Sequence, residues 1–336
     1  MKAIRIIAAL SLGVGSVAFA KEAEPLFRST DLMRITIKGP VGAASDAPKP
    51  ATLAMGAETL PISFTARGIT RRQKDICPFP PLRVIFNQPP PATSLFAGQK
   101  RLKLVTHCRS GADFQQYALL EYAAYQMYNA LTPLSFRARL AMIDYVADNG
   151  KPIASRYGFF IEDVDEVAAR NGFKEPKTPD RVPVSVLSPP HAARFAMFQH
   201  MLGNHDWSMR AGPAGEGCCH NGRLVGPLPG TSLLAPVPYD FDFSGMVGTP
   251  YATPPDQIPI SNVRIRFYRG YCSHNLQALQ VAAEMRAKRA ELLGILAATP
   301  GLDDRSKGRA SAYVERFFAD IATDELTKTK VLKNCQ

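Results

Sequence analysis

The chain has 336 residues, of which 46% are hydrophobic, and its formal net charge at pH 7 is +11. This length and hydrophobic content are enough for one large domain or a two-lobed unit with a hydrophobic core. The basic charge favours anionic partners, namely nucleotides, acidic proteins or nucleic acid. No run of about five like charges marks a nucleic-acid-binding arm. No stretch of the mature chain reaches about 18 apolar residues, so we expect no stable membrane insertion.

The first 20 residues have the pattern of a targeting segment. Lys2 and Arg5 form a short basic start, residues 6–19 are apolar and small, and Ala18-Phe19-Ala20 is an A-x-A cleavage site. This pattern predicts a secretory signal peptide over residues 1–20, cleaved after Ala20. We therefore expect a periplasmic or secreted mature protein.

The first half of the mature chain is predicted to be rich in strands, which alternation of apolar residues indicates over residues 33–37, 60–67, 82–86 and 100–107. The period then changes, because residues 113–131 contain no Gly or Pro and carry an apolar stripe at helical spacing. Thr132-Pro133 ends this predicted helix. Two further strands and a short helix follow, over residues 137–145, 156–161 and 163–170.

The second half is predicted to be mostly helical. Residues 171–190 are polar and rich in proline, which indicates a linker or loop. The later elements are helices over residues 191–202, 272–297 and 304–322, with one strand over residues 236–241. The sequence thus predicts an α+β fold with two lobes. Its expected parts are the signal peptide (1–20), an N-terminal extension (21–58), an N-lobe (59–171) and a C-lobe (172–336).

Six cysteines, an even number, suit disulfides in an oxidising compartment. We expect one bond between Cys77 and Cys108, and another between Cys272 and either Cys218 or Cys219. A zinc site is the less favoured alternative, because no C-x-x-C spacing occurs. Its candidate ligands would be the cysteines and histidines at positions 218, 219, 220, 272 and 274.

The string Gly203-Asn204-His205-Asp206 suggests a metal-dependent phosphoesterase. Such an enzyme also needs an early Asp-x-His and a late His pair for its second metal ion. Neither an Asp-x-His nor a Gly-His-x-His occurs among the six histidines of this chain. A four-residue match without its partners is weak, so we set this interpretation aside.

A second interpretation is phosphoryl transfer, which depends mainly on positioning and charge neutralisation. Its parts occur in the required order along the chain, as Lys103, Glu121, Asp206, Asn221, Asp240 and Asp242. Each of them has an ordinary structural interpretation when taken alone. Asp240 and Asp242 are the strongest candidates, because two carboxylates on one strand face repel unless a cation or donor lies between them.

These motifs carry a resemblance to a known family. "LGNHDWS" (202–208), "HN" (220–221) and "VPYDFDFSG" (237–245) resemble the C-lobe of CotH-type (spore coat protein H) kinases, and more distantly HipA-type kinases. Upstream, "FTARGITRR", "LKLVTHC" and "NGKPIASRYGFFIEDVDEVA" are similar to CotH-type segments, so the likeness covers roughly residues 55–270. It implies a two-lobed protein-kinase-like fold, with a β-rich N-lobe and an α-rich C-lobe.

The resemblance also implies roles for particular residues. Lys103 would contact the phosphates of ATP with Glu121 as its partner, and Glu162 would face the adenine side. Asp206 would be the catalytic aspartate. The ligands of Mg²⁺ or Mn²⁺ would be Asn221 and Asp240, with Asp242 in addition.

The leading hypothesis is therefore an exported kinase-like phosphotransferase that moves the γ-phosphate of ATP to a protein or a small acceptor. An acidic protein is a candidate substrate, given the basic charge of the chain. Two alternatives remain: a catalytically inactive kinase-like binding module of the cell envelope, and a metal-dependent phosphohydrolase. The same carboxylates would serve all three.

Overall fold

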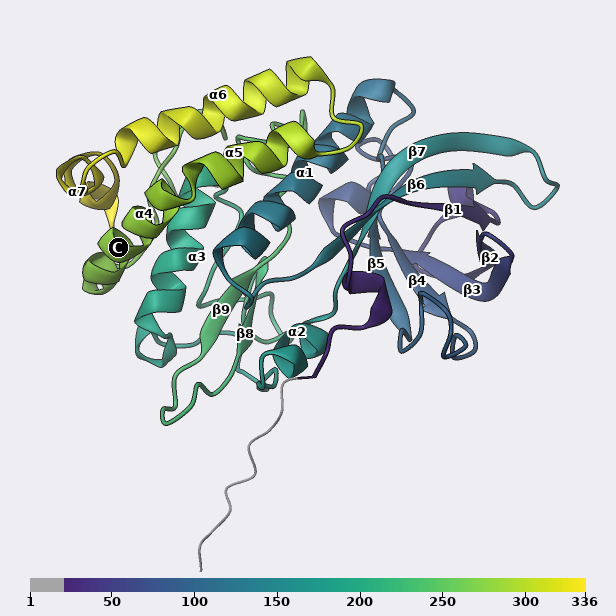
Figure 1. Cartoon of the computed structure of the whole chain (residues 1–336), viewed down its shortest axis with the longest axis horizontal. Helices are drawn as coiled ribbons and strands as arrows, with labels where there is room; N and C mark the ends of the chain where they lie inside the picture. The colour runs from purple at the N-terminus through teal and green to yellow at the C-terminus, as the bar shows by residue number, and fades with distance from the viewer. Residues whose placement is uncertain (1–20) are drawn as a thin grey trace, which may run out of the picture.

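The computed structural model describes residues 21–336, so the predicted signal peptide lies outside the described residues. Seven strands close into a barrel in the order β1-β2-β3-β4-β5-β7-β6. Their bounds are β1 Met33–Lys38, β2 Lys49–Met55, β3 Glu58–Ala66, β4 Leu82–Phe86, β5 Arg101–Val105, β6 Ala138–Val146 and β7 Pro152–Ile161. The barrel occupies one end of the molecule and the helices the other (Figure 1).

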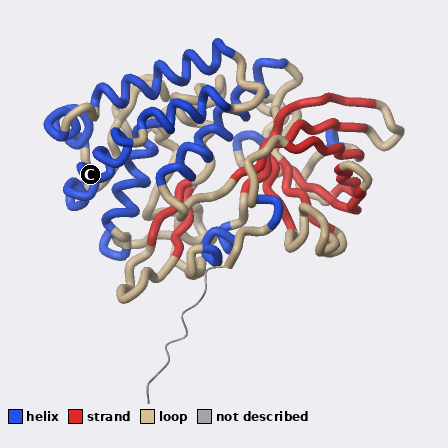
Figure 2. The backbone as a smooth tube through the Cα atoms, in the orientation of Figure 1, coloured by secondary structure: helices blue, strands red, loops and turns tan. Residues whose placement is uncertain are grey.

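The remaining elements follow the barrel strands or connect them, and most are helices (Figure 2). The helices are α1 Ala112–Leu131, α2 Val164–Arg170, α3 Pro189–Leu202, α4 Asn275–Ala287, α5 Arg289–Ala298, α6 Asp304–Asp320 and α7 Asp324–Leu326. A two-stranded antiparallel sheet joins β8 Gly222–Val225 to β9 Ala235–Pro238. Within residues 21–336, no helix is both long enough and apolar enough to cross a bilayer.

The predicted two-lobed protein-kinase-like α+β fold is wrong, because the β-rich half is a closed barrel. Closure results from β1, which pairs with β2 on one side and runs parallel to β6 on the other. β2 was not predicted, since only Leu53 of its seven residues is buried and no alternation marks it. Periodicity identifies strands one at a time but says nothing about which strands pair.

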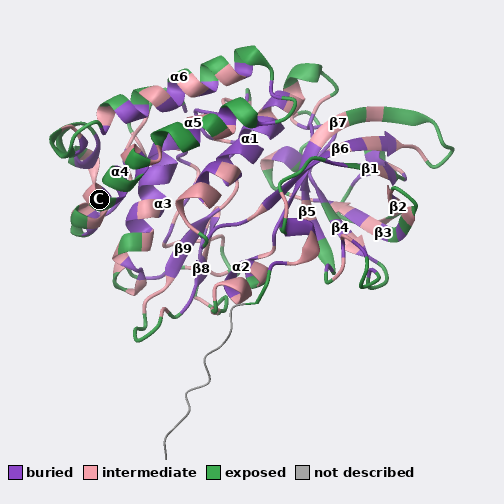
Figure 3. Ribbon diagram, viewed as in Figure 1, coloured by how far each residue is buried: buried purple, intermediate pink, exposed green. Residues whose placement is uncertain are grey.

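Two hydrophobic cores meet at β7. Phe160 points into the barrel, while Phe159 and Ile161 point to the opposite face and pack with the helices. This follows from the period of two along a strand. α1 lies between the barrel and the other helices and is buried along most of its length (Figure 3). It thus connects the barrel to the part of the chain that carries Asp206 and Asp240.

Three disulfides join the six cysteines. The Cys77–Cys108 bond is confirmed. The expected bond from Cys272 to Cys218 or Cys219 is wrong, because Cys272 pairs with Cys335 and the two neighbouring cysteines pair with each other. The chain end returns to Cys272, whose backbone N–H donates to the carbonyl of Gln336 at 2.9 Å. With all six sulfurs paired, the zinc alternative is wrong as well.

Candidate active site

A cavity of about 340 Å³ collects four of the predicted site residues from distant parts of the chain: Asp206, Asn221, Asp240 and Asp242. Asp206 follows α3, Asn221 directly precedes β8, and the two other aspartates follow β9. Positive groups line the same cavity, namely the side chains of Arg67, Arg71, Arg223 and, when protonated, His220. The arrangement is suited to an anionic ligand held beside a carboxylate.

Asp206 is held by two side chains that follow the long loop after it. Its Oδ1 lies 2.7 Å from His220 Nε2. Asn221 Nδ2 donates to Asp206 Oδ2 at 3.0 Å and to the Asp206 carbonyl at 2.7 Å. The hydrogen bond with Asp206 raises the pKa of His220, against the opposing effect of burial. Both carboxylate oxygens are therefore oriented, while the side chain still reaches the cavity.

The backbone around Asp206 is fixed on its N-terminal side. α3 ends at Gly203 in a left-handed conformation with φ +61°, and a Cβ there would collide with the Tyr313 hydroxyl. Asn204 Oδ1 accepts a hydrogen bond from the Asp206 backbone N–H at 3.1 Å, which makes a tight turn. Trp207, the only Trp of the chain, donates to the Asn204 carbonyl at 2.9 Å. The buried indole thus anchors the turn that presents Asp206.

Arg71 lies at the centre of a cluster of three acids. Its guanidinium is 3.2 Å from Glu121, 3.0 Å from Asp240 and 3.1 Å from Asp242. The residue is only 8% exposed. It belongs to a short turn after β3, so its three ion pairs connect the barrel to α1 and to the segment after β9.

The protonation of the three acids is unequal. Burial raises the pKa of Asp242 well above its usual value, although Arg71 opposes the rise. Burial also raises the pKa of Glu121. Burial alone would raise the pKa of Asp240 too, but the attraction of Arg71 holds it below its usual value. Asp240 is thus the carboxylate that stays ionised and faces the cavity.

The backbone of Asp240 is also constrained. It has φ +63°, in the left-handed region that few residues other than glycine adopt. Its N–H donates to the Tyr125 hydroxyl of α1 at 2.9 Å. Asn204 Nδ2 donates to its carbonyl at 3.4 Å, so the turn that carries Asp206 is joined directly to Asp240.

Lys103 lies in a second, larger cavity of about 660 Å³, which also contains Asp163 and Glu175. The two cavities share Glu216 and Arg223 in their walls. The Lys103 ammonium lies 5.7 Å from the Phe136 ring centroid and 5.6 Å from that of Tyr239. Burial lowers the pKa of Lys103 to about 8.

The expected partnership of Lys103 with Glu121 is corrected by the structure, because Glu121 pairs with Arg71 instead. Glu121 is buried on α1, and the Arg71 turn after β3 reaches it there from the barrel. Glu162 is fully buried and accepts hydrogen bonds from Arg170 and from the Arg137 backbone N–H. It lines neither of the two cavities described above, so the structure does not bring it to the expected adenine side.

The residues fit a hard divalent cation in part. No cluster of three or more His, Cys, Asp or Glu suited to a metal ion occurs among residues 21–336. Mg²⁺ needs fewer protein ligands, because it uses one or two carboxylates together with substrate phosphates and water. Asp240 and Asn221 offer carboxylate and amide oxygens at one cavity. Asp242 does not fit, since its carboxyl is engaged by Arg71 and by the Tyr251 hydroxyl at 3.0 Å.

Sequence reasoning missed Arg71 and His220 as members of the site. Arg71 stands in the "FTARGITRR" segment, but nothing in the spacing distinguishes it from Arg67 or Arg72. The signal for His220 was its position directly before Asn221. His205, directly before Asp206, does not line the cavity and instead bonds through Nε2 to the Ile265 carbonyl at 2.9 Å.

Comparisons with known proteins do not assign this chain to a family. No protein-family model matches the sequence. No curated protein matches it either. Among solved structures, the chain is similar to the Helicobacter pylori proinflammatory kinase CtkA, with 9% sequence identity and a TM-score of 0.40. That match covers 75% of this chain and 92% of the other. Membership of the CotH-type family stays a prediction.

Proposed function

We propose that the chain is an exported phosphotransferase that moves the γ-phosphate of ATP to a hydroxyl of a protein or small acceptor. One observation carries the proposal: Asp206 is oriented by His220 and Asn221 at a cavity that is also lined by Asp240 and by several arginine side chains. Such an arrangement combines a proton acceptor with a field for a polyanion, which are the two things that phosphoryl transfer requires.

In this proposal Asp206 accepts or orients the proton of the acceptor hydroxyl as the oxygen attacks phosphorus. His220 and Asn221 hold the carboxylate in place. Arg67 and Arg223, which line the cavity, attract the phosphates. Arg71 orients Asp240 rather than the phosphates, because its ion pairs with the three acids engage all three of its guanidinium nitrogens.

Asp240 and Asn221 are the residues that would hold Mg²⁺ or Mn²⁺. When bound, such a cation neutralises phosphate charge as it develops. Asp240 suits this role because its pKa is held below the usual range by Arg71 despite burial, so the carboxylate stays ionised. Asp242 is left to its ion pair with Arg71.

The two cavities together suit a nucleotide. They are adjacent, since Glu216 and Arg223 line both, and we propose that one ligand extends from Asp206 in one cavity to Lys103 in the other. We assign the phosphates to the smaller cavity and the nucleoside to the larger one. Lys103 then serves as a positive group beside the ligand rather than as the partner of Glu121.

Export is part of the proposal and is supported by the predicted signal peptide over residues 1–20 and by three disulfides. An acidic protein remains the favoured class of macromolecular acceptor, because the net charge is +11.

The test is transfer of label from γ-labelled ATP to an acidic test protein, by oxidised mature protein with Mg²⁺ and then with Mn²⁺. Labelled acceptor is the expected result. Nucleotide binding without transfer would favour the binding-module alternative. Release of labelled phosphate in the absence of any labelled acceptor would favour the phosphohydrolase alternative.

Replacement of Asp240 by Asn is expected to weaken Mn²⁺ binding in the presence of a non-hydrolysable ATP analogue. The loss should be at least the roughly 10- to 100-fold that removal of an outer-shell partner costs at other metal sites. Calorimetry would measure it. Asp242→Asn should change Mn²⁺ affinity much less, because that carboxyl is engaged by the Tyr251 hydroxyl as well as by Arg71. Equal losses in the two variants would contradict the assignment.

ATP affinity is expected to fall by up to about tenfold between about pH 7 and about pH 9, since Lys103 loses its charge over this range. The reason is that burial lowers the pKa of Lys103 to about 8. Binding isotherms across this pH range would measure the fall. It should vanish in Lys103→Met and persist in Lys100→Met, whose lysine is exposed. A flat profile for the wild-type protein would refute the role of Lys103.

A further inference from the structure

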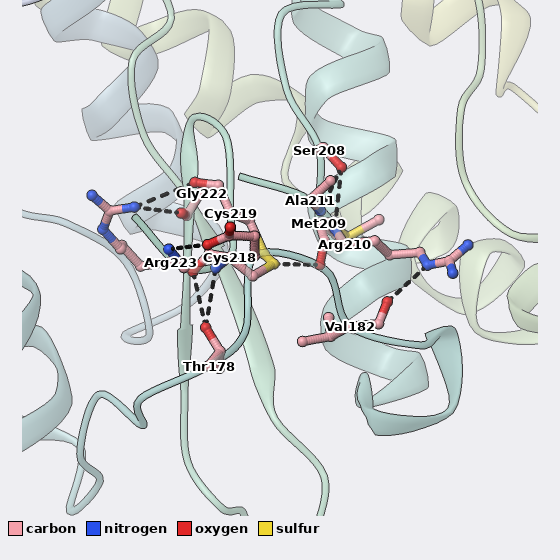
Figure 4. The surroundings of a disulfide bond; sticks show 12 residues. Thr178, Val182, Ser208, Met209, Arg210, Ala211, Cys218, Cys219, Gly222 and Arg223 are labelled. Atoms are coloured by element: carbon pink, nitrogen blue, oxygen red, sulfur yellow. Dashed lines mark hydrogen bonds between the residues drawn. A yellow bond between two sulfur atoms is a disulfide. The ribbon is translucent and has the colours of Figure 1, made fainter. Parts of the chain in front are cut away.

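The neighbouring residues Cys218 and Cys219 form a disulfide that lies in the wall of both cavities. Cys218 lines the larger cavity and Cys219 the smaller one. Both are largely buried, at 7% and 2% exposure. Figure 4 shows the pair between Thr178 on one side and the Ser208–Ala211 segment on the other.

This disulfide directly precedes the residues that hold Asp206. His220 and Asn221 follow Cys219 in sequence, and both bond to the Asp206 carboxylate. The two ends of the loop are also joined through the backbone. The Ser208 N–H donates to the His220 carbonyl at 3.0 Å, and the His220 N–H donates to the Ala211 carbonyl at 2.8 Å.

Before the disulfide, the loop is held from outside by hydrogen bonds. Asp180 accepts from the backbone N–H groups of Gly215 at 2.7 Å and Gly217 at 2.8 Å. Thr178 Oγ1 accepts from the Cys218 N–H at 3.1 Å. The Cys218–Cys219 disulfide lies between these hydrogen bonds and the two residues that bond to Asp206, His220 and Asn221. It adds a covalent restraint at that point of the loop.

A disulfide between adjacent residues differs in effect from the two others. The entropic stabilisation by a crosslink grows with the length of the loop that it closes. The sequence separations are 31 for Cys77–Cys108 and 63 for Cys272–Cys335, but only 1 for Cys218–Cys219. Its effect therefore lies in local geometry, which it imposes on the segment that leads into His220 and Asn221.

We infer that Cys218 and Cys219 are positioning residues, and that reduction of their disulfide lowers phosphoryl transfer by releasing His220 and Asn221 from Asp206. This inference rests on the proposed function for its effect on turnover. The reductant is a dithiol. One thiolate of the reagent attacks one cysteine sulfur, which breaks the S–S bond and expels the other cysteine as a thiolate. The second thiolate then attacks the reagent sulfur of the mixed disulfide and displaces the remaining cysteine. The two protons of the dithiol end on the cysteines, and the reagent leaves as its oxidised, cyclic disulfide.

The decisive variant is Cys218→Ser with Cys219→Ser, and its matched control is Cys272→Ser with Cys335→Ser, which removes a disulfide that lines neither cavity. We expect kcat to fall about 100-fold in the first variant, a loss that a misplacement of about 1 Å can cause. KM for ATP should change less than kcat, because Arg67 and Asp240 line the cavity from segments after β3 and β9, outside this loop. The control should keep the kcat of the wild-type protein.

A second measurement does not depend on activity. Hydrogen exchange of the Ser208 and His220 amides should be faster in the 218/219 variant than in the wild-type protein or the 272/335 variant. Unchanged exchange together with unchanged kcat would overturn the inference. Peptide mapping that finds Cys218 and Cys219 unpaired in the oxidised protein would overturn it as well.

Failure of the proposed function gives a different pattern. If the wild-type protein transfers no phosphate but the 218/219 variant exchanges faster at Ser208 and His220, the positioning role of the disulfide stands and the phosphotransferase proposal falls.

Discussion

Replacement of Arg71 by Met is expected to lower the free energy of unfolding by about 3–5 kcal/mol, the usual cost of removing one partner of a buried ion pair. Arg71 is 8% exposed and makes ion pairs with Glu121, Asp240 and Asp242. Met fills a similar volume, so the loss reports charge rather than a cavity. Denaturant titration followed by Trp207 fluorescence would measure it.

The loss should depend on pH in a defined direction. Burial already raises the pKa of Glu121 and of Asp242 in the folded protein, and Arg71 opposes both shifts. Without Arg71 these pKa values rise further, and a raised folded-state pKa gives stability that is lost as pH increases. The deficit of the variant should therefore be smaller near the unfolded-state pKa of a carboxyl group than at neutral pH.

Arg72→Met is the matched control for this prediction. Arg72 belongs to the same turn, but its side chain is 47% exposed and pairs with the exposed Asp46. An exposed pair contributes between about 0 and 1 kcal/mol. Equal losses in the two variants would show that the buried ion pairs of Arg71 contribute no more to the free energy of unfolding than an exposed pair does.

Replacement of Asp206 by Asn is expected to abolish most transfer, with kcat reduced by about 10²- to 10⁴-fold. The amide keeps an oxygen that can accept from His220 or Asn221, so the loop should keep its shape, but it cannot accept a proton. Label transfer from γ-labelled ATP would measure the change. Nucleotide affinity should remain near that of the wild-type protein, which separates a catalytic defect from a binding defect.

Asp256→Asn serves as the control for charge, because Asp256 is exposed and lines neither cavity. It should keep full transfer. If Asp206→Asn retained the wild-type rate, Asp206 would not be the proton acceptor, and the basis of the proposed function would be lost.

Most individual helices and strands could be predicted from the sequence, but the pairing of the strands into a barrel could not. The strand predicted over residues 82–86 coincides with β4, and the helix predicted over residues 113–131 matches α1 within one residue. The single helix predicted over residues 272–297 is in fact α4 and α5, which are separated at Lys288. Barrel closure was not predictable, because it depends on the pairing of β1 with β6, about 100 residues further along the chain.

The residues of the candidate site were likewise predictable only in part. Its carboxylates were recognisable, since the adjacent residues and the order along the chain single out Asp206, Asp240 and Asp242. Their partners were not. Arg71 lies 50 residues from Glu121 and 169 residues from Asp240 in sequence, and no local period relates positions so far apart.

By itself, the sequence determined which residues could do chemistry and most of the helices and strands that carry them, because periodicity and turn residues act over a few neighbouring positions. Only the tertiary structure decided how those residues combine. It pairs Glu121 with Arg71 instead of Lys103, and it brings His220 and Asn221 back to Asp206. The reason is that burial and long-range packing select the partner of each charge.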